Sequence, residues 1–226
     1  MSTATLNRSR LAARCAELPD LDEADLGARV LAALPTHESR SAGLLREWAE
    51  TASRFGTELA DESGVSGVSS ADSLVSQVGL QVVQEDGGLT RTRLTLAQYG
   101  TRPPAVRVYS DAVAVAEEVV ELLGWRAWFP PGSVRDIGVC HEVAHHLLHG
   151  RPGAALKHRL GHVVLHMGPM TVRGHVIGAD EIAAHSFARA ICGLPKSPLL
   201  INLALKEASG IADLAQRPLA HAGKEV

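Results

Sequence analysis

The chain has 226 residues, a formal net charge of −3 at pH 7 and a hydrophobic content of 46%. This length and composition predict one domain with appendages, with ample apolar residues for a core. The near-balanced charge, without a long basic run, argues against nucleic acid binding as the main activity. With three cysteines, no signal peptide and no apolar stretch of about 18 residues, we expect a cytoplasmic protein without disulfides or membrane spans.

The N-terminal part of the chain is expected to be helical. Residues 1–20 are polar and alanine-rich, and they predict a loose arm. Apolar residues recur at helical spacing over 22–34 and 39–59, which predicts two amphipathic helices. These helices lack the short turn and the basic face of a helix-turn-helix motif, so we expect them to serve packing. The Ser- and Gly-rich run 62–70 predicts a linker.

This linker divides the chain into a helical N-terminal region, 1–62, and a second region, 63–226, which begins with a short helix at 70–77. Three segments of the second region alternate or cluster like β-strands: 80–84, 92–96 and 104–109. They predict a small antiparallel sheet and an α+β fold class. An exposed edge strand, at 91–96 or 105–109, would hold an extended peptide by backbone pairing.

Two helices are expected after the sheet. The first covers 111–123 and is capped by Ser110 or Asp111. The second covers 134–149, because apolar residues recur there every three or four positions after a Pro-Pro-Gly breaker. Ser133 suits the N-cap position of this second helix.

The sequence also predicts where the later helices start and stop. Gly150 follows the helix over 134–149, and Pro152 is expected to prevent its continuation. A further helix begins near Asp180 and ends at Gly193. Leucines at helical spacing predict a last helix within 196–216.

The most informative motif of the chain is His141-Glu142-Val143-Ala144-His145. Two histidines four apart on a helix share one face, so both imidazoles are able to bind one Zn²⁺ ion. The glutamate beside the first histidine is placed to act as general base on a metal-bound water. The alternative interpretation is a polar helix face with two solvated or core histidines.

A catalytic zinc site usually has a third protein ligand. The metzincin pattern requires Gly at 148 and His at 151, but this chain has Leu148 and Arg151. Glu181 is our candidate, since it lies in the first turn of the next helix, where the helix dipole favours a carboxylate. His185, four residues further on the same face, would orient a ligand from behind.

Other assignments remain open at this point. Glu181 also fits an ordinary carboxylate at a helix start, and Asp180 is expected to be a cap. His149 continues the histidine ladder, but each four-residue step drifts by about 40°, so three histidines of one helix converge poorly on one ion. The remaining histidines nearby are expected mainly at the surface or in the core: His146, His158, His162, His166 and His175.

These residues resemble the ImmA/IrrE family of bacterial zinc metallopeptidases. The matching pieces are H-E-V-A-H-H-L-L-H at 141–149, E-x-x-A-x-x-F-A at 181–188 and L-P at 194–195. The resemblance implies a zincin-like fold in which a small antiparallel sheet packs on a metal-binding helix pair. It also implies that His141, His145 and Glu181 bind zinc and that Glu142 is the catalytic base. Proteins of this family typically cleave or inactivate helix-turn-helix repressors.

Three functional hypotheses follow. The first is a cytoplasmic zinc endopeptidase acting on a regulatory protein such as a transcriptional repressor. The second is a non-catalytic module, stabilised by zinc, that sequesters a regulatory partner; a fourth protein ligand such as His149 or His175 would support it. The third is a zinc hydrolase for a non-peptide amide. Four residues are candidates for the donor that stabilises the transition state: Tyr109, Arg173, His175 and His185.

Overall fold

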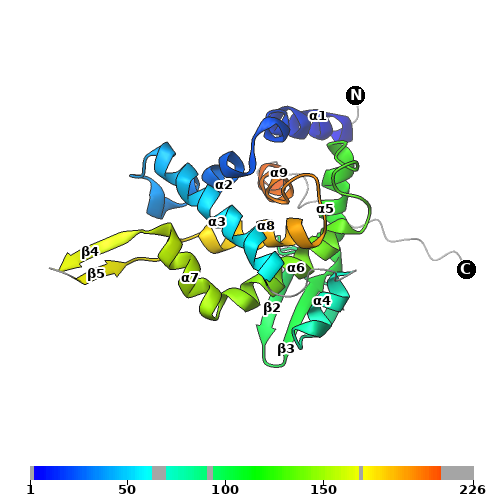
Figure 1. The fold of residues 1–226 in the computed structure, drawn as a ribbon. Helices are drawn as coiled ribbons and strands as arrows, with labels where there is room; N and C mark the ends of the chain where they lie inside the picture. The colour runs from blue at the N-terminus through cyan, green and yellow to red at the C-terminus, as the bar shows by residue number, and fades with distance from the viewer. Residues whose placement is uncertain (1–2, 63–69, 91–93, 168–169, 210–226) are drawn as a thin grey trace, which may run out of the picture.

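The computed structural model describes residues 3–62, 70–90, 94–167 and 170–209. They form an α+β fold of nine helices and two small sheets, drawn in Figure 1. The helices are α1 Thr3–Cys15, α2 Glu23–Ala32, α3 Ala42–Glu62, α4 Ala71–Gln77, α5 Ser110–Leu122, α6 Ser133–Leu148, α7 Arg151–Leu160, α8 Ala179–Ile191 and α9 Leu199–Ser209. The strands are β1 Val82–Glu85, β2 Ala97–Thr101, β3 Pro104–Tyr109, β4 Val163–Met167 and β5 Met170–Arg173. Within the described residues, every helix is too short or too polar to cross a membrane.

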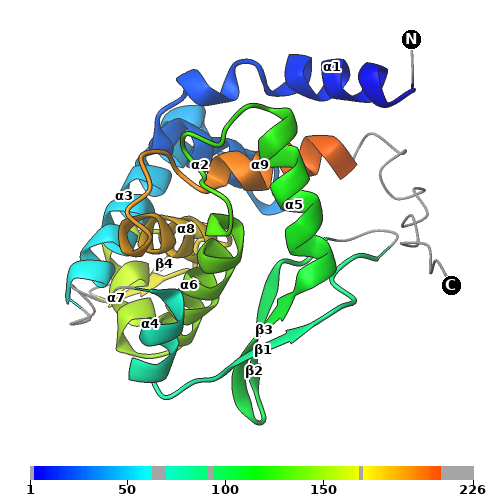
Figure 2. The same cartoon turned by 90° about the vertical axis from the view of Figure 1, so that its right-hand side faces the viewer.

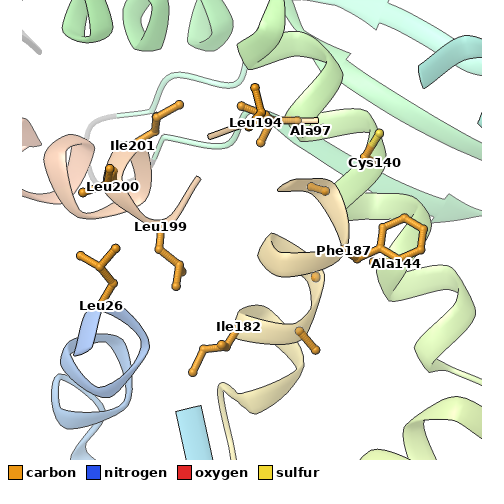
Figure 3. Close-up of a cluster of buried hydrophobic side chains, with 14 of the residues drawn as sticks. Leu26, Ala97, Cys140, Ala144, Ile182, Phe187, Leu194, Leu199, Leu200 and Ile201 are labelled. Atoms are coloured by element: carbon orange, nitrogen blue, oxygen red, sulfur yellow. The ribbon is translucent and has the colours of Figure 1, made fainter. Parts of the chain in front are cut away.

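The centre of the fold is α8, which lies between α3 and α6. Most of α8 is buried, and its small side chains permit close contact. A Cβ atom added to Gly56 of α3 would overlap the carbonyl oxygen of Ala183, so the two backbones touch directly. On other sides of α8, Ile182 faces Leu26 of α2 and Phe187 lies beside Ala144 of α6 (Figure 3). These contacts hold α8 on the helix that carries the H-E-x-x-H motif.

One continuous hydrophobic core joins elements from both of the regions expected from the sequence. Figure 2 shows the order of the elements across the molecule: α3, then α8, then α6, and last the three-stranded sheet. The division into 1–62 and 63–226 stays a prediction, and most of the expected linker, 63–69, lies outside the described residues.

The three-stranded sheet has the order β1-β3-β2. Strand β2 pairs antiparallel with β3, as expected, but β1 pairs parallel with it, so the expectation of an antiparallel sheet is wrong for that pair. The alternation of apolar residues reports which side chains are buried and carries no information on strand direction. Because β3 is the central strand, with Val106 and Val108 buried, the expected edge strand at 105–109 is also wrong.

The strand expected at 92–96 is displaced in the structure. Leu94 makes only an isolated bridge with Leu89, and residues 91–93 lie outside the described part of the chain. Thr95 N–H donates to Gly88 O at 2.9 Å, which ties Thr95 to a loop, and Leu96 O, at the end of the segment, accepts from Tyr109 N–H of β3 at 2.9 Å. The edge strand beside β3 is therefore β2, Ala97–Thr101.

The start of the chain is helical, so the expected loose arm over 1–20 is wrong for its described residues. Leu11 and Cys15 of α1 and Leu18 of the following 3-10 helix, Leu18–Asp20, are buried. Figure 2 shows α1 lying across one end of the molecule beside α9. A few apolar residues at helical spacing suffice, because α9 supplies the surface that they cover.

Helix α6 is within one residue of its expected range, but its cap differs. The N-cap is Gly132, with φ 87°, and the expected cap Ser133 is the first helical residue with a buried, unpaired Oγ. Glu117 of α5 takes the capping role, since Glu117 Oε1 accepts hydrogen bonds from Gly132 N at 3.1 Å and Val134 N at 3.4 Å. A tertiary carboxylate thus replaces the local cap.

The segment after α6 contains three elements that the sequence did not predict: α7, β4 and β5. Helix α6 ends at Leu148, but α7 begins at Arg151, with Pro152 in its first turn. A proline at that position needs no backbone donor, so it starts a helix as readily as it stops one. The other expected helices match α2, α3, α4, α5, α8 and α9, although residues 210–216 of the last expected range lie outside the described part.

Candidate metal centre

Two histidines of α6 and one glutamate of α8 point at one another. His141 Nε2 lies 3.0 Å from His145 Nε2. Glu181 Oε2 is 3.3 Å from His141 Nε2, and Glu181 Oε1 is 3.2 Å from His145 Nε2. Among the residues that the structure describes, these three form the one group of His, Cys, Asp or Glu side chains close enough to hold a metal ion.

The spacing of these atoms fits a zinc ion. Bonds of about 2.0–2.2 Å to nitrogen and oxygen in a tetrahedron separate the ligand atoms by roughly 3.3–3.5 Å. The separation of the two Nε2 atoms, 3.0 Å, and the distances from each of them to its nearer Glu181 oxygen, 3.3 and 3.2 Å, are close to that value. The side chain of Glu181 is 46% exposed, whereas those of His141 and His145 are mostly buried. The group is thus open to solvent on the side of Glu181, where a water molecule or substrate has access.

The charges of the group also suit a cation. Burial by itself would raise the pKa of Glu181, but hydrogen bonds from the rings of His141 and His145 hold that pKa well below its usual range. Burial by itself would lower the pKa of His145, but the effect of the Glu181 carboxylate is larger, so that the pKa of His145 is raised overall. Glu181 is therefore ionised, and both ring nitrogens already face its charge.

Glu142 projects from the same helix toward the sheet. Tyr99 N–H of β2 donates to Glu142 Oε2 at 2.7 Å. Tyr99 pairs with Val106, whose own N–H donates to Gln81 O on the far side of β3. The Tyr99–Val106 pair is therefore the non-hydrogen-bonded type, and Tyr99 N–H points to the free edge of the sheet. A fixed backbone donor thus holds one oxygen of Glu142.

Tyr99 was not identified from the sequence. Its main-chain contact with Glu142 depends on where β2 begins, and no side-chain pattern marks that position. The ring of Tyr99 packs against His146, with centroids 5.0 Å apart. His146, which points away from His141 and His145 along α6, thereby helps to hold β2 against α6.

His185 lies behind His141, as expected from its position on α8. Its ring is buried and packs on the ring of His141, with centroids 4.4 Å apart, while its Nε2 lies 3.1 Å from Asn202 Nδ2 of α9. Burial lowers the pKa of His185 well below its usual value, with a further contribution from His141. A neutral ring at this place supports His141 by packing and adds no positive charge beside a bound cation.

The other candidate ligands do not converge on this point. His149 and His175 lie at a neighbouring pocket, and the expected cap Asp180 sits in the first turn of α8, whose N-cap is Gly178. His162 packs its ring on Trp48 at 5.2 Å. His158 is exposed on α7, and the side chain of His166 lies outside the described part.

Two of the four candidate transition-state donors are directed elsewhere. Tyr109 OH donates to Gln98 Oε1 at 3.2 Å on the sheet, and Arg173 is exposed on β5. His185 is buried behind His141. His175 lines the pocket that His145 also lines, so among the four candidates it is the one placed to contact a molecule bound there.

The pocket beside the three ligands has a volume of about 170 Å³. Its apolar lining comes from the end of α6 and from α7. Its polar lining comes from the end of α6, from α7 and from the start of α8 with the segment before it. The lining residues are His145, Leu148, His149, Gly153, Leu156, Lys157, His175 and Asp180. A pocket at this place would accept one side chain of a molecule bound at the centre.

Comparisons with known proteins add no relative. No protein-family model, no curated protein and no solved structure matches this chain.

Proposed function

We propose that this chain is a cytoplasmic, zinc-dependent endopeptidase in which His141, His145 and Glu181 bind the metal and Glu142 is the general base. The observation that carries the proposal is the convergence of three side chains from two helices: the two histidine Nε2 atoms lie 3.0 Å apart, and each lies 3.2–3.3 Å from one oxygen of Glu181. The base belongs to the same helix, and the group is open on the side of Glu181. Those features together are what metal-assisted hydrolysis requires.

The roles of the residues follow from their positions. A zinc ion at this site would polarise a substrate carbonyl and lower the pKa of a water molecule. Glu142 accepts the proton from the attacking water and returns it to the leaving amine. Because Tyr99 N–H holds Glu142 Oε2, the other oxygen is left to carry this proton.

The free edge of β2 suits a peptide substrate. Tyr99 N–H points to that edge and reaches Glu142. An extended peptide that pairs with the edge would pass directly beside the base. From the family resemblance of the motif, we propose a regulatory protein such as a helix-turn-helix repressor as the substrate.

The alternative of a zinc-stabilised binding module has less support. Structural zinc sites are closed by four protein ligands, whereas the group found among the described residues has three. His149 and His175, which would have completed such a shell, line the neighbouring pocket instead.

Replacing the base tests the proposed activity. The zinc-loaded Glu142→Gln variant is expected to keep its metal and to lose turnover by about 10²–10⁴-fold. The measurement is the release of new amino termini from a mixture of unfolded proteins, read by mass spectrometry. Glu47→Gln, an exposed change on α3, is the matched control and should cleave at the wild-type rate. Equal cleavage by Glu142→Gln and wild type would remove Glu142 from the mechanism.

A further inference from the structure

The strands β4 and β5 expose an unusual amount of apolar surface. Seven large hydrophobic side chains are exposed among the described residues, and five of them lie between 163 and 177. We call these five the hairpin patch: Val163, Val164, Leu165, Val172 and Ile177, with exposed fractions of 36–57%. Clustered exposed apolar residues of this kind mark interaction sites, whereas single ones are ordinary.

The base of the hairpin is firmly attached to the body. Gly174 N–H donates to His162 O at 2.7 Å, and the His162 ring packs on Trp48 of α3. His37 Nε2 lies 2.9 Å from Ile177 O, just after β5. From this base the two strands extend away from the helices, as Figure 1 shows. The projection is thus held in a fixed direction.

No third strand lies beside this hairpin among the described residues. Two-stranded hairpins are marginal in water, and a third strand or a packed face is what usually stabilises them. Among the described residues, β4 and β5 pair with each other, and Val163, Val164 and Leu165 of β4 are exposed, so the outer edge of β4 has room for a further strand. This is the arrangement that binds an extended segment by strand addition.

The charge of the surrounding segment specifies what kind of strand fits. Residues 150–178, which include α7 and the hairpin, contain four Arg or Lys and four His but no Asp or Glu, in a chain of net charge −3. One of the four, Arg159, is already paired with Glu58 of α3. Arg173 ends β5, and Lys157 lines the pocket beside His145. An acidic partner segment is complementary to this surface.

The hairpin is also continuous with the candidate metal centre. Directly after β5 the chain passes His175, which lines the pocket shared with His145, and then enters α8 at the turn that holds Glu181. A segment bound along the hairpin would therefore be led toward the pocket and the three ligands. Binding of one substrate segment at the hairpin would raise the local concentration of the scissile region at the candidate metal centre.

We propose that β4 and β5 form a docking edge for an extended segment of the protein substrate in which aliphatic and acidic residues alternate. The aliphatic side chains cover the part of the hairpin patch on one face of the hairpin, and the acidic ones pair with basic side chains beside it, such as Arg173. The proposal rests on the proposed peptidase function, because it assigns the bound segment to that substrate. Nucleic acid is less suited, since the exposed Val and Leu side chains offer nothing to phosphates.

Binding is tested apart from cleavage, with the full-length Glu142→Gln protein. The probes are three fluorescein-labelled peptides of equal length, which alternate Glu with Val, Lys with Val, and Glu with Ser. Fluorescence anisotropy should show the Glu/Val peptide binding at least about tenfold more tightly than the other two. Hydrogen exchange of the β4 and β5 amides should slow when this peptide is added.

Two variants locate the binding surface. Val172→Glu, at a side chain 40% exposed, should weaken binding of the Glu/Val peptide at least about tenfold, and its matched control is Val83→Glu on β1, 41% exposed. Arg173→Glu should act in the same direction, with Arg54→Glu on α3 as its control. Thermal unfolding confirms that each variant is folded.

The outcomes separate this proposal from the proposed function. Undiminished peptide binding by both Val172→Glu and Arg173→Glu overturns the docking edge, even if the wild type cleaves proteins. Binding of a DNA duplex at the hairpin in place of the Glu/Val peptide overturns it as well. Absence of cleavage by the wild type, with peptide binding that depends on Val172 and Arg173, removes the peptidase and leaves the edge as a binding site.

Discussion

The helix pair α6–α8 and the β4–β5 hairpin are neighbours in the fold but are held in opposite ways. The inner faces of α6 and α8 are buried, and their contact places His141, His145 and Glu181 within 3.0–3.3 Å of one another. The hairpin is attached at its base through His162, Gly174 and Ile177, and it exposes apolar side chains of both strands. Metal donors need exact placement by a packed core, whereas a capture surface needs accessible backbone and side chains.

The largest contrast should appear when one buried and one exposed hydrophobic residue are truncated. Phe187→Ala removes a fully buried ring between α8 and α6 and should lower the free energy of unfolding by about 3–5 kcal/mol. Leu165→Ala, on the hairpin, should change it by less than about 0.5 kcal/mol. Urea unfolding of both variants measures the difference. Comparable losses would mean that the hairpin is packed in solution, and the contrast would fail.

A smaller effect is expected from adding one methyl group at each of two glycines of α3. Gly56→Ala forces a Cβ into the carbonyl oxygen of Ala183, so α3 and α8 must separate, at a cost of about 1–3 kcal/mol. Gly43→Ala meets no atom within 4 Å and should stabilise the helix by up to about 1 kcal/mol. The pair is compared by thermal or urea unfolding. Opposite signs support direct backbone contact at Gly56, and two stabilising changes would contradict it.

The motif-bearing helix was predictable because its signals are local. The spacing of His141 and His145 and the apolar stripe of α6 lie within one short segment. The proximity of Glu181 to the two histidines was also predictable, since a carboxylate in the first turn of a second amphipathic helix is a recognisable candidate for a third metal ligand. The contact of both helices through small residues then brings the three side chains together.

The remaining features depend on tertiary contacts that leave no local pattern. The direction of β1 relative to β3 is set when β3 inserts between β1 and β2, and side-chain alternation is the same for either direction. The contact between Tyr99 N–H and Glu142 uses a main-chain group. Helix α7 follows Gly150 and contains Pro152 in its first turn, and these two residues are stop signals in one context and start signals in another.

The proposed metal centre requires that His141, His145 and Glu181 together hold one zinc ion. The most direct measurement is the zinc content per chain, by inductively coupled plasma mass spectrometry, of the wild type, Glu181→Ala and its neighbour control Asp180→Ala. The account predicts one zinc per chain in the wild type and in Asp180→Ala, and a large loss in Glu181→Ala. A wild-type chain that stays metal-free when supplied with zinc, or a Glu181→Ala chain that retains a full complement, would contradict it.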